Sequence, residues 1–585
     1  MAVLAAPLPA LAFEATLSAP GAPDDIADKL RGASSLMGAE DSGLSTSQEL
    51  LAAALADYRT IVQVLYDSGY FSPAVSILVD GREASAIPLI SPPGKIDKAV
   101  IKVDTGPIFR FGLARVAPLA PDTEMPEGFA KGETATTGII REAASAGRDG
   151  WRNSGYAKVA IGDQRITANH RSNTLDADIK LIPGQKLRFG NLTVTGNSKV
   201  QTAAIRRIAG FPTGEVYSPQ MVQKVGSRLR RTGAFSSVAL VEAPKANPDG
   251  TLDYTIQVAE QLPRRITFGA EVESNSGVTL SAIWLHRNLL GRAERLQLEG
   301  EVRNIGGTDD IDGRLAFRLD FPERLGPDNN LFYLGSLERI DRDHYTMNVA
   351  QLGVGARRTF SDQLYAELSL IYSYSDADDA YGEGRKFRVL KMPFHAELDR
   401  RDSSQSATSG YYLDAKLTPF GGISGSSSGL QAVLDGRKYL SLTETGSIVL
   451  AGRVQMGSVL GAEADSTSPD MLFFSGGAGT VRGQPYESLG IPVNGDVAGG
   501  RSLLAASAEV RARVTTAISV VGFFDWAAVG SSSFIDGDTE SHAGAGLGLR
   551  YDVGGFGPIR LDLAMPVSGD TGDGLQFYLG IGQAF

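Results

Sequence analysis

Apolar and polar side chains alternate along residues 264–585, in runs of about ten residues that end at Gly, Asp, Asn or Ser. Alternation of this period places two sets of side chains on opposite faces of a β-strand. Sixteen such runs can be distinguished, and an even number of amphipathic strands is typical of a transmembrane β-barrel. The pattern therefore predicts an all-β, 16-stranded barrel over residues 264–585. In one run, residues 557–566, the apolar face consists of Ile559, Leu561, Leu563 and Met565.

Two other architectures fit the chain less well than the barrel does. A soluble β-sandwich gives similar alternation, but about 320 residues would need two such domains, and no boundary between them is visible. A helical membrane span needs about 18 or more consecutive apolar residues, and the longest candidate, Val514–Phe524, is too short. We therefore expect any membrane crossing to be made by the strands of a barrel.

Residues 13–263 show a different pattern, in which helical and strand periodicities follow each other and the whole unit repeats. A short motif that begins with Gly ends each helical stretch, and a Phe-Gly pair follows each motif. The Phe residues of these pairs, Phe111, Phe189 and Phe268, are 78 and 79 residues apart. The spacing predicts three domains of about 80 residues, with boundaries at 13–107, 108–186 and 187–263.

Within each repeat the pattern predicts a strand, two helices and two further strands. In the first repeat, Thr46 and Glu49 have the spacing of a capping box, and the helical periodicity that follows ends at Gly69. In the third, Ser218 and Pro219 are typical of a helix start. We therefore expect α+β repeats, each with a small sheet covered on one face by two helices.

Residues 1–12 are apolar and end in a small-x-small pattern, Ala10-Leu11-Ala12, like a signal-peptidase site. No basic segment precedes this stretch, so we interpret residues 1–12 as the tail of a secretory signal peptide that starts upstream. An ordinary apolar first strand is the alternative.

The composition excludes several classes of protein. A formal net charge of −11 argues against nucleic acid as the main partner. The absence of Cys excludes disulfide scaffolds and thiolate metal sites. The five His residues are scattered without a zinc-binding spacing, and no Walker motif or nucleophile elbow is present. We therefore expect no enzymatic activity, no catalytic residues, no cofactor and no metal site.

The longest gap between predicted strands lies between runs 445–457 and 500–513 and contains a glycine-rich stretch, residues 473–490. Dense glycine lets a backbone fold tightly against another surface, and Arg482 is the single cation of this stretch. Its planar guanidinium suits a carboxylate partner. A flexible surface loop with a solvated Arg is the alternative interpretation.

The three repeats resemble POTRA domains in their order of elements, although a generic α/β repeat with no membrane role is the alternative. Together with the barrel, they resemble the POTRA-plus-barrel assembly superfamily of outer membranes, which includes BamA, TamA and the two-partner secretion transporters. Val481, Arg482 and Gly483 match the VRG(Y/F) loop motif of the superfamily. Gln484 replaces the aromatic residue, for which Tyr486 can stand in. Three repeats, rather than five or two, favour the TamA family.

The resemblance implies that the loop folds into the barrel lumen and that its Arg pairs with acidic residues on the wall. The wall motifs of the superfamily fall on Glu509, Phe523 and Asp525. Alternation independently allows this pairing, because Asp525 lies on the face opposite Trp526, and an outward Trp526 would direct Asp525 inward.

The first and last strands are expected to meet at a weak lateral seam. We assign Ile266 and Phe268 of the first strand and Leu579 and Ile581 of the last strand to this seam. Gly580 and Gly582, on the inward face of the last strand, should shorten the pairing. Phe585, in phase with Phe577, resembles a C-terminal recognition signal for barrel assembly.

The resemblance implies a protein of the cell outer membrane of a Gram-negative bacterium, with its POTRA domains in the periplasm. Its expected function is to insert or secrete β-barrel clients such as autotransporters. The expected partners are outer-membrane lipid, unfolded clients and an inner-membrane-anchored TamB-like protein that reaches the first POTRA unit. A two-partner-secretion-type transporter or passive channel is the first alternative, an inert barrel with a binding role the second, and a soluble enzyme a distant third.

Overall fold

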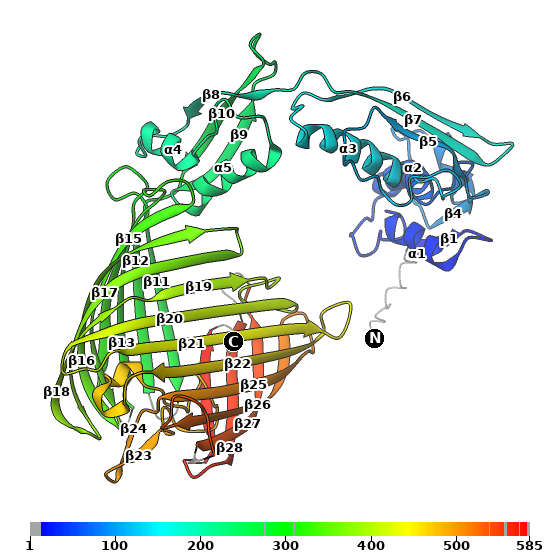
Figure 1. Ribbon diagram of the computed structural model, residues 1–585. Coiled ribbons are helices and arrows are strands. Elements are labelled where there is room, and N and C mark those ends of the chain that lie inside the picture. The colour runs from blue at the N-terminus through cyan, green and yellow to red at the C-terminus, as the bar shows by residue number, and fades with distance from the viewer. Residues whose placement is uncertain are drawn as a thin grey trace, which may run out of the picture. The chain divides into compact units, whose positions relative to one another are not determined.

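The computed structural model describes residues 13–273, 277–307, 310–537, 539–554, 558–571 and 574–581 (Figure 1). It divides into two compact units. The first contains the first two repeats and part of the third, and the second contains the rest of the third repeat and the barrel. The predicted signal-peptide segment, residues 1–12, lies outside the described residues, as does Phe585. No described helix is both long enough and apolar enough to span a bilayer.

The first repeat is a four-stranded sheet with the strand order β1-β4-β2-β3, packed against two helices. Thr46 and Glu49 form the predicted capping box, in which each side chain accepts from the backbone of the other residue. The apolar side of the second helix packs on the sheet through Leu51, Ile61 and Leu65, which are fully buried. The elements are β1 (Glu14–Ser18), α1 (Asp24–Ala33), α2 (Ser47–Asp67), β2 (Ala74–Val79), β3 (Arg82–Glu83), a short 3₁₀ turn (Ala84–Ala86) and β4 (Lys98–Asp104).

The second repeat has one helix, so the prediction of two helices in every repeat was wrong here. Its elements are β5 (Arg110–Ala117), α3 (Thr137–Asn153), β6 (Ala160–Asn169) and β7 (Thr174–Ile182), with the sheet order β5-β7-β6. The segment 118–135 lies between β5 and α3, where the predicted order of elements requires another helix, and it contains three prolines and two glycines. Proline removes a helical donor and glycine raises the entropic cost of a helix. The segment therefore forms turns instead.

The third repeat consists of β8 (Arg188–Thr195), α4 (Thr202–Ala209), α5 (Pro219–Arg231), β9 (Phe235–Glu242) and β10 (Thr251–Glu260). Its sheet has the order β8-β10-β9. Pro219 is the first residue of α5, as predicted. Gly210 ends α4 in the left-handed conformation, with φ of 52°.

Sixteen antiparallel strands form a closed barrel, which confirms the predicted fold class. β18 and β19 are two parts of the eighth strand, interrupted at Met392 and Pro393, where proline cannot donate to the ladder. The strands are β11 (Arg264–Glu273), β12 (Gly277–His286), β13 (Arg295–Ile305), β14 (Asp312–Phe321), β15 (Asn329–Arg342), β16 (Tyr345–Thr359), β17 (Leu364–Asp379), β18 (Gly382–Lys391), β19 (Phe394–Asp399), β20 (Gly410–Ser424), β21 (Gly429–Ser441), β22 (Ile448–Leu460), β25 (Ser502–Arg513), β26 (Ile518–Gly530), β27 (Glu540–Asp552), β28 (Pro558–Ser568) and β29 (Gln576–Ile581).

The two faces of the barrel wall differ as the alternation predicts. Large apolar side chains such as Phe268, Leu315 and Leu337 are exposed on one face. Charged side chains on the other face pair across the lumen wall; Arg318, for example, donates to Glu367 at 2.7 Å. An apolar exterior and a polar interior are what a lipid-embedded barrel requires.

Within the second compact unit, the third repeat is tied to two turns of the barrel. Ala293, from the turn between β12 and β13, belongs to the apolar core under α4 and α5. Arg228 of α5 donates to Asp328 at 2.7 Å, and Arg231 reaches the same carboxylate at 2.5 Å. Burial opposes ionisation of Asp328, but the hydrogen bonds from both guanidinium groups outweigh it and hold its pKa below the usual value. The turn 322–328 is therefore clamped by two cations.

Candidate functional site in the barrel lumen and at its seam

The loop that carries the predicted motif connects β22 to β25 at the end of the barrel opposite the start of β11. Two short 3₁₀ turns (Ala464–Ser466 and Pro469–Met471) precede the glycine-rich stretch. A small hairpin follows it, formed by β23 (Ile491–Val493) and β24 (Asp496–Ala498). Backbone hydrogen bonds of Ser475 with Leu489 and of Phe473 with Gly500 close the loop on itself. The loop is therefore an ordered structure with its own contacts.

Arg482 lies at the centre of a buried group of charges. Its Nε donates to Asp525 Oδ2 at 2.8 Å, and its Nη1 donates to Glu509 Oε1 at 2.7 Å. Nη1 also reaches Asp562 Oδ2 at 3.2 Å, and the backbone N–H of Arg482 donates to Asp525 at 3.1 Å. The guanidinium stacks on Phe523, with Cζ 3.6 Å from the ring centroid. The structure thus brings together Arg482 and the three wall residues that the resemblance implied.

Two further arginines complete the group. Arg511 donates to Glu509 Oε2 at 2.8 Å, and Arg550 hydrogen-bonds to Asp562. Three carboxylates therefore meet three guanidinium groups in a space from which solvent is almost excluded, since Arg482 is 2 % exposed. Removing one partner of such a buried pair leaves an uncompensated charge, at a cost of about 3–5 kcal/mol.

The backbone on either side of Arg482 is fitted to the wall. Gly483 has φ of +95°, and a Cβ there would lie 2.7 Å from backbone atoms of Met565. Gly544 faces the loop in the same way, because a Cβ on it would lie 2.0 Å from the carbonyl oxygen of Arg482. The N–H of Gly483 donates to the hydroxyl of Tyr578 on the last strand at 2.9 Å. The VRG motif therefore allows a close approach of two backbones.

Gln484 occupies the position where the superfamily motif has an aromatic residue, and it is fully buried. Its Nε2 donates to the carbonyls of Ala543 and Ser568 at 2.8 and 3.0 Å. Thr571 donates to its Oε1 at 2.9 Å. Gln484 thus joins the loop to β27 and β28 through hydrogen bonds.

The loop also contacts the opposite wall. Tyr486 lies over Arg342 of β15, with Cζ of the arginine 5.2 Å from the ring centroid. Phe474 stacks on Tyr345 at the start of β16, with 5.6 Å between centroids. The loop therefore spans the lumen, with Arg482 in contact with one part of the wall and Tyr486 in contact with the opposite part.

The seam between β11 and β29 is short among the described residues. It pairs Val272 with Leu579 and Glu273 with Tyr578, whereas β28 and β29 pair at six positions. Ile266 and Phe268 pair with Trp284 and Ala282 of β12 on the other edge of β11. In the observed register Leu579 faces Val272, so Ile266 and Phe268 are not its partners. The side chain of Ile581 lies outside the described residues.

Sequence reasoning missed Asp562, Arg511 and Arg550 as members of the charged group. Alternation in the run 557–566 does place Asp562 on the inward face. No local signal, however, indicates that β28 lies within reach of Arg482. That proximity depends on the closure of the barrel and on the depth to which the loop enters it.

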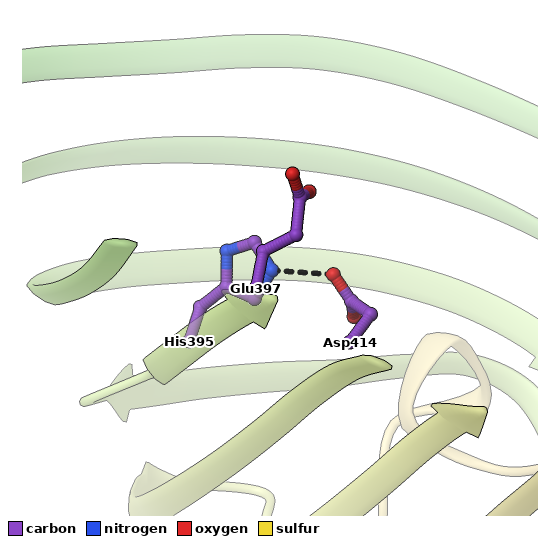
Figure 2. Close-up of side chains that lie close together, drawn as sticks. All are labelled: His395, Glu397 and Asp414. Carbon is purple, nitrogen blue, oxygen red and sulfur yellow. Dashed lines mark hydrogen bonds and ion pairs between the residues drawn. The ribbon is translucent and has the colours of Figure 1, made fainter. Parts of the chain in front are cut away.

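A second polar cluster on the lumen wall was also missed. His395 and Glu397 lie two residues apart on β19, and Asp414 lies opposite Glu397 on β20. His395 Nε2 lies 2.6 Å from Asp414 Oδ2, while the Glu397 carboxylate points away from Asp414 (Figure 2). The hydroxyls of Tyr365 and Tyr412 donate to Glu397 at 3.0 and 3.2 Å.

The candidate ligand atoms of this cluster lie within 4.8 Å of one another. Ligands of a tetrahedral zinc ion are separated by about 3.5 Å, given metal–ligand bonds of about 2.0–2.2 Å. The existing hydrogen bonds account for the arrangement of all three side chains. The three side chains therefore form a hydrogen-bonded part of the wall.

Comparisons with known proteins agree with this architecture. Residues 288–585 match the Omp85 superfamily domain, and residues 187–261 match the POTRA repeat described as a surface antigen variable number repeat. The chain belongs to the Omp85 superfamily. It is an outer-membrane β-barrel protein whose POTRA repeats lie in the periplasm.

Among individual relatives, the chain is 22 % identical over 534 residues to the outer membrane protein assembly factor BamA of Neorickettsia risticii, covering 86 % of this chain and 68 % of that protein. It is also 22 % identical over 498 residues to BamA of Neisseria meningitidis, covering 74 % and 61 %.

Two solved structures share the fold. BamA from Haemophilus ducreyi lacking POTRA domains 1–3 gives a TM-score of 0.62 at 18 % identity, over 81 % of this chain and 100 % of that chain. CdiB from Acinetobacter baumannii gives a TM-score of 0.50 at 13 % identity, over 82 % and 90 %.

Proposed function

We propose that this protein is an outer-membrane assembly factor that inserts or secretes β-rich clients, autotransporters above all, in the manner expected of the TamA family. Membership of the Omp85 superfamily and likeness to relatives named as assembly factors support this proposal. The three repeats that precede the barrel also support it. Such a function depends on binding of the client and on pairing between strands, and it requires no catalytic group.

The observation that carries the proposal is the unequal pairing of β11. Among the described residues, which leave out 274–276 and 582–585, this strand pairs with β12 at ten positions and with β29 at two. Backbone donors and acceptors along an unpaired strand edge can accept an extended segment of another chain. A client strand would add to this edge while the loop holds the remaining wall in place.

A reversible lock tests the seam. Because the chain has no Cys, a Val272→Cys/Leu579→Cys variant reports without background, and the two residues are register partners. Oxidation should join the strands and stop client assembly in cells or proteoliposomes, and reduction should restore it.

The matched control is Leu561→Cys/Leu579→Cys, which locks the register pair on the other edge of the same strand. This variant should assemble clients whether oxidised or reduced. Wild-type assembly by the barrel with a locked seam would contradict the proposed function.

The proposed partner is an inner-membrane-anchored TamB-like protein that docks on the first repeat. In that repeat β1 is an edge strand that pairs with β4 alone among the described strands, and such an edge supports strand addition. Deletion of residues 13–107 should abolish co-purification of the TamB-like protein while the barrel still inserts. Retention of the partner by the truncated protein would contradict docking at this repeat.

A transporter or passive channel is the second candidate, because the lumen holds a polar cavity of about 780 Å³ lined by Arg318, Glu367 and Lys416, among others. Conductance of the purified barrel in a planar bilayer separates the two functions. An assembly factor whose loop spans the lumen should conduct poorly, and Arg482→Ala should conduct more. High conductance of the unmodified protein would favour the channel.

A further inference from the structure

We propose that Arg560 and Glu271 form a latch across the seam, that Gly580 makes room for it, and that the buried loop cluster holds it in position. This inference rests on the proposed function, because a latch matters for a seam that opens. It assigns a positioning role to three residues that the loop motif does not include.

The latch passes over the last strand. Arg560 on β28 donates from Nη2 to Glu271 Oε1 on β11 at 2.9 Å, although β29 lies between these two strands. Arg560 is the register partner of Gly580. The pairing of Val272 with Leu579 places Glu271 opposite Gly580 in turn. The three residues therefore form one inward-facing row across three strands.

Gly580 leaves the space through which the two side chains meet. A Cβ at this position would lie 3.4 Å from both Arg560 Nη2 and Glu271 Oε1. An alanine would fit at ordinary contact distance, whereas a larger side chain would occupy the path of the ion pair. The glycine in the last strand thus has a specific consequence beyond weakening the strand.

The latch is connected to the loop through Asp562. Arg560 Nε lies 4.0 Å from Asp562 Oδ2, and the same oxygen accepts from Arg482 Nη1 at 3.2 Å. The chain of charges therefore runs from the loop to β28 and from there to the first strand. Tyr578 adds a second link, because its hydroxyl on β29 accepts from Gly483. Displacement of the loop would therefore remove a contact from Asp562, which lies beside Arg560, and from Tyr578 on β29.

The two ends of this series of charged side chains differ in burial. The Asp562 side chain is fully buried, whereas the Glu271 side chain is 52 % exposed. An ion pair with a half-exposed carboxylate is weak and screened by salt. A weak contact at the end of a firmly held network suits a seam that opens and closes without disturbing the loop.

Hydrogen exchange of the full-length protein in detergent tests the latch without reference to clients. In Glu271→Gln, peptides covering residues 264–273 and 576–581 should exchange roughly two- to fivefold faster, the factor that corresponds to an ion pair of this exposure. The matched control is Glu338→Gln, which removes a lumenal carboxylate that Arg303 contacts at the same 2.9 Å. Equal seam exchange in the two variants would overturn the proposal.

Substitutions at Gly580 test whether the ion pair between Arg560 and Glu271 needs the space above β29. They leave both charges in place. Gly580→Leu should exchange as fast as Glu271→Gln, and Gly580→Ala should exchange like the unmodified protein. Loop coupling predicts faster seam exchange in Arg482→Lys as well, although the described residues include no contact between Arg482 and β11. Unchanged seam exchange in Gly580→Leu would refute the role of Gly580 in making room for the ion pair. Unchanged seam exchange in Arg482→Lys would refute the coupling between the loop and the seam.

The outcomes separate the latch from the proposed function. Faster seam exchange with unchanged client assembly would support the latch and count against assembly through the seam. Unchanged seam exchange in Glu271→Gln, combined with loss of assembly in the disulfide-locked barrel, would refute the latch and leave the proposed function standing.

Discussion

The two edges of the last barrel strand, β29, are held in different ways. On the β28 side, six residue pairs continue an ordinary ladder, and buried charges lie directly behind it. On the β11 side, the described register has two pairs, supplemented by the half-exposed Glu271 carboxylate. Both edges belong to the same strand, so the outward apolar residues of β29 do not account for the difference. The described part of the β11 edge therefore has fewer backbone pairs, and a more exposed ion pair, than the β28 edge.

The difference arises from burial more than from residue type, since both edges use arginine and carboxylate side chains. Charges around Arg482 are sealed from solvent by the loop and by Phe523. In that environment a missing partner is costly, whereas at the seam solvent screens the pair. Variants that change burial or charge at one edge should therefore show how far the other depends on it.

The largest expected effect follows from Arg482→Ala. It leaves Glu509, Asp525 and Asp562 without their shared cation, and it should destabilise the loop and its wall by about 3–5 kcal/mol while the barrel still inserts. Client assembly and the midpoint of thermal unfolding measure the effect. Arg437→Ala, which removes a more exposed lumenal arginine bonded to Asp435, is the control. Wild-type assembly by Arg482→Ala would refute the anchoring role.

A smaller loss is expected from Gly483→Ala, which adds a Cβ 2.7 Å from the Met565 backbone at a φ of +95°. Backbone strain of this kind costs about 1–3 kcal/mol, so assembly should fall in part. Gly479→Ala in the same loop is the matched control, because a Cβ there meets nothing within 4 Å. Protease sensitivity of the loop should increase in the first variant alone; equal sensitivity would contradict the close fit.

The clamp on the turn 322–328 offers a pH test at the other end of the barrel. The pKa of Asp328 is lowered in the folded protein. Its stabilising contribution is therefore complete above the unfolded pKa of about 3.9 and is lost as the pH falls through the folded value. Hydrogen exchange of α5 should accelerate below about pH 4. In Asp328→Asn, exchange should be fast at neutral pH too, with the acid-dependent step reduced; an unchanged step would exclude Asp328 as its source.

The smallest effect is expected at Phe585. Deletion of this residue should lower the amount of inserted barrel in cells, because an aromatic in phase with Phe577 resembles a recognition signal for barrel assembly. Since Phe577 is retained, the loss should be partial. Surface protease accessibility in whole cells gives the measurement, and deletion of Gln583 alone is unsuitable as a control because it shifts the phase. Replacement by Tyr is suitable and should retain insertion.

The sequence predicted the barrel well because period-2 alternation reports the burial of each strand face directly. The sixteen predicted runs match the sixteen strands when β18 and β19 are counted as one, and the interruption between these two coincides with Pro393. The same logic fails where local signals conflict. In the second repeat, the expected first helix was carried over from the pattern of the other repeats, although prolines at 118, 121 and 126 oppose it.

In the candidate site, too, local patterns predicted some features and missed others. Alternation placed Asp525 inward, and the structure puts it in contact with Arg482. Contacts set by closure of the barrel were beyond local reasoning. Asp562 reaches the loop, and Glu271 reaches Arg560 across 289 residues of sequence, because the sixteenth strand returns to the first. Their register depends on a global count of residues that no local pattern contains.

The core beneath α4 and α5 has a consequence for how such proteins can change over evolutionary time. Its repeat type is described as variable in number, yet the third copy shares Ala293 with a barrel turn and is bound to another turn through Asp328. Gain or loss of units is therefore expected among the copies nearer the N-terminus. The copy next to the barrel should instead be inherited with it, so that chimeras exchanged before residue 187 should fold and those cut after residue 263 should not.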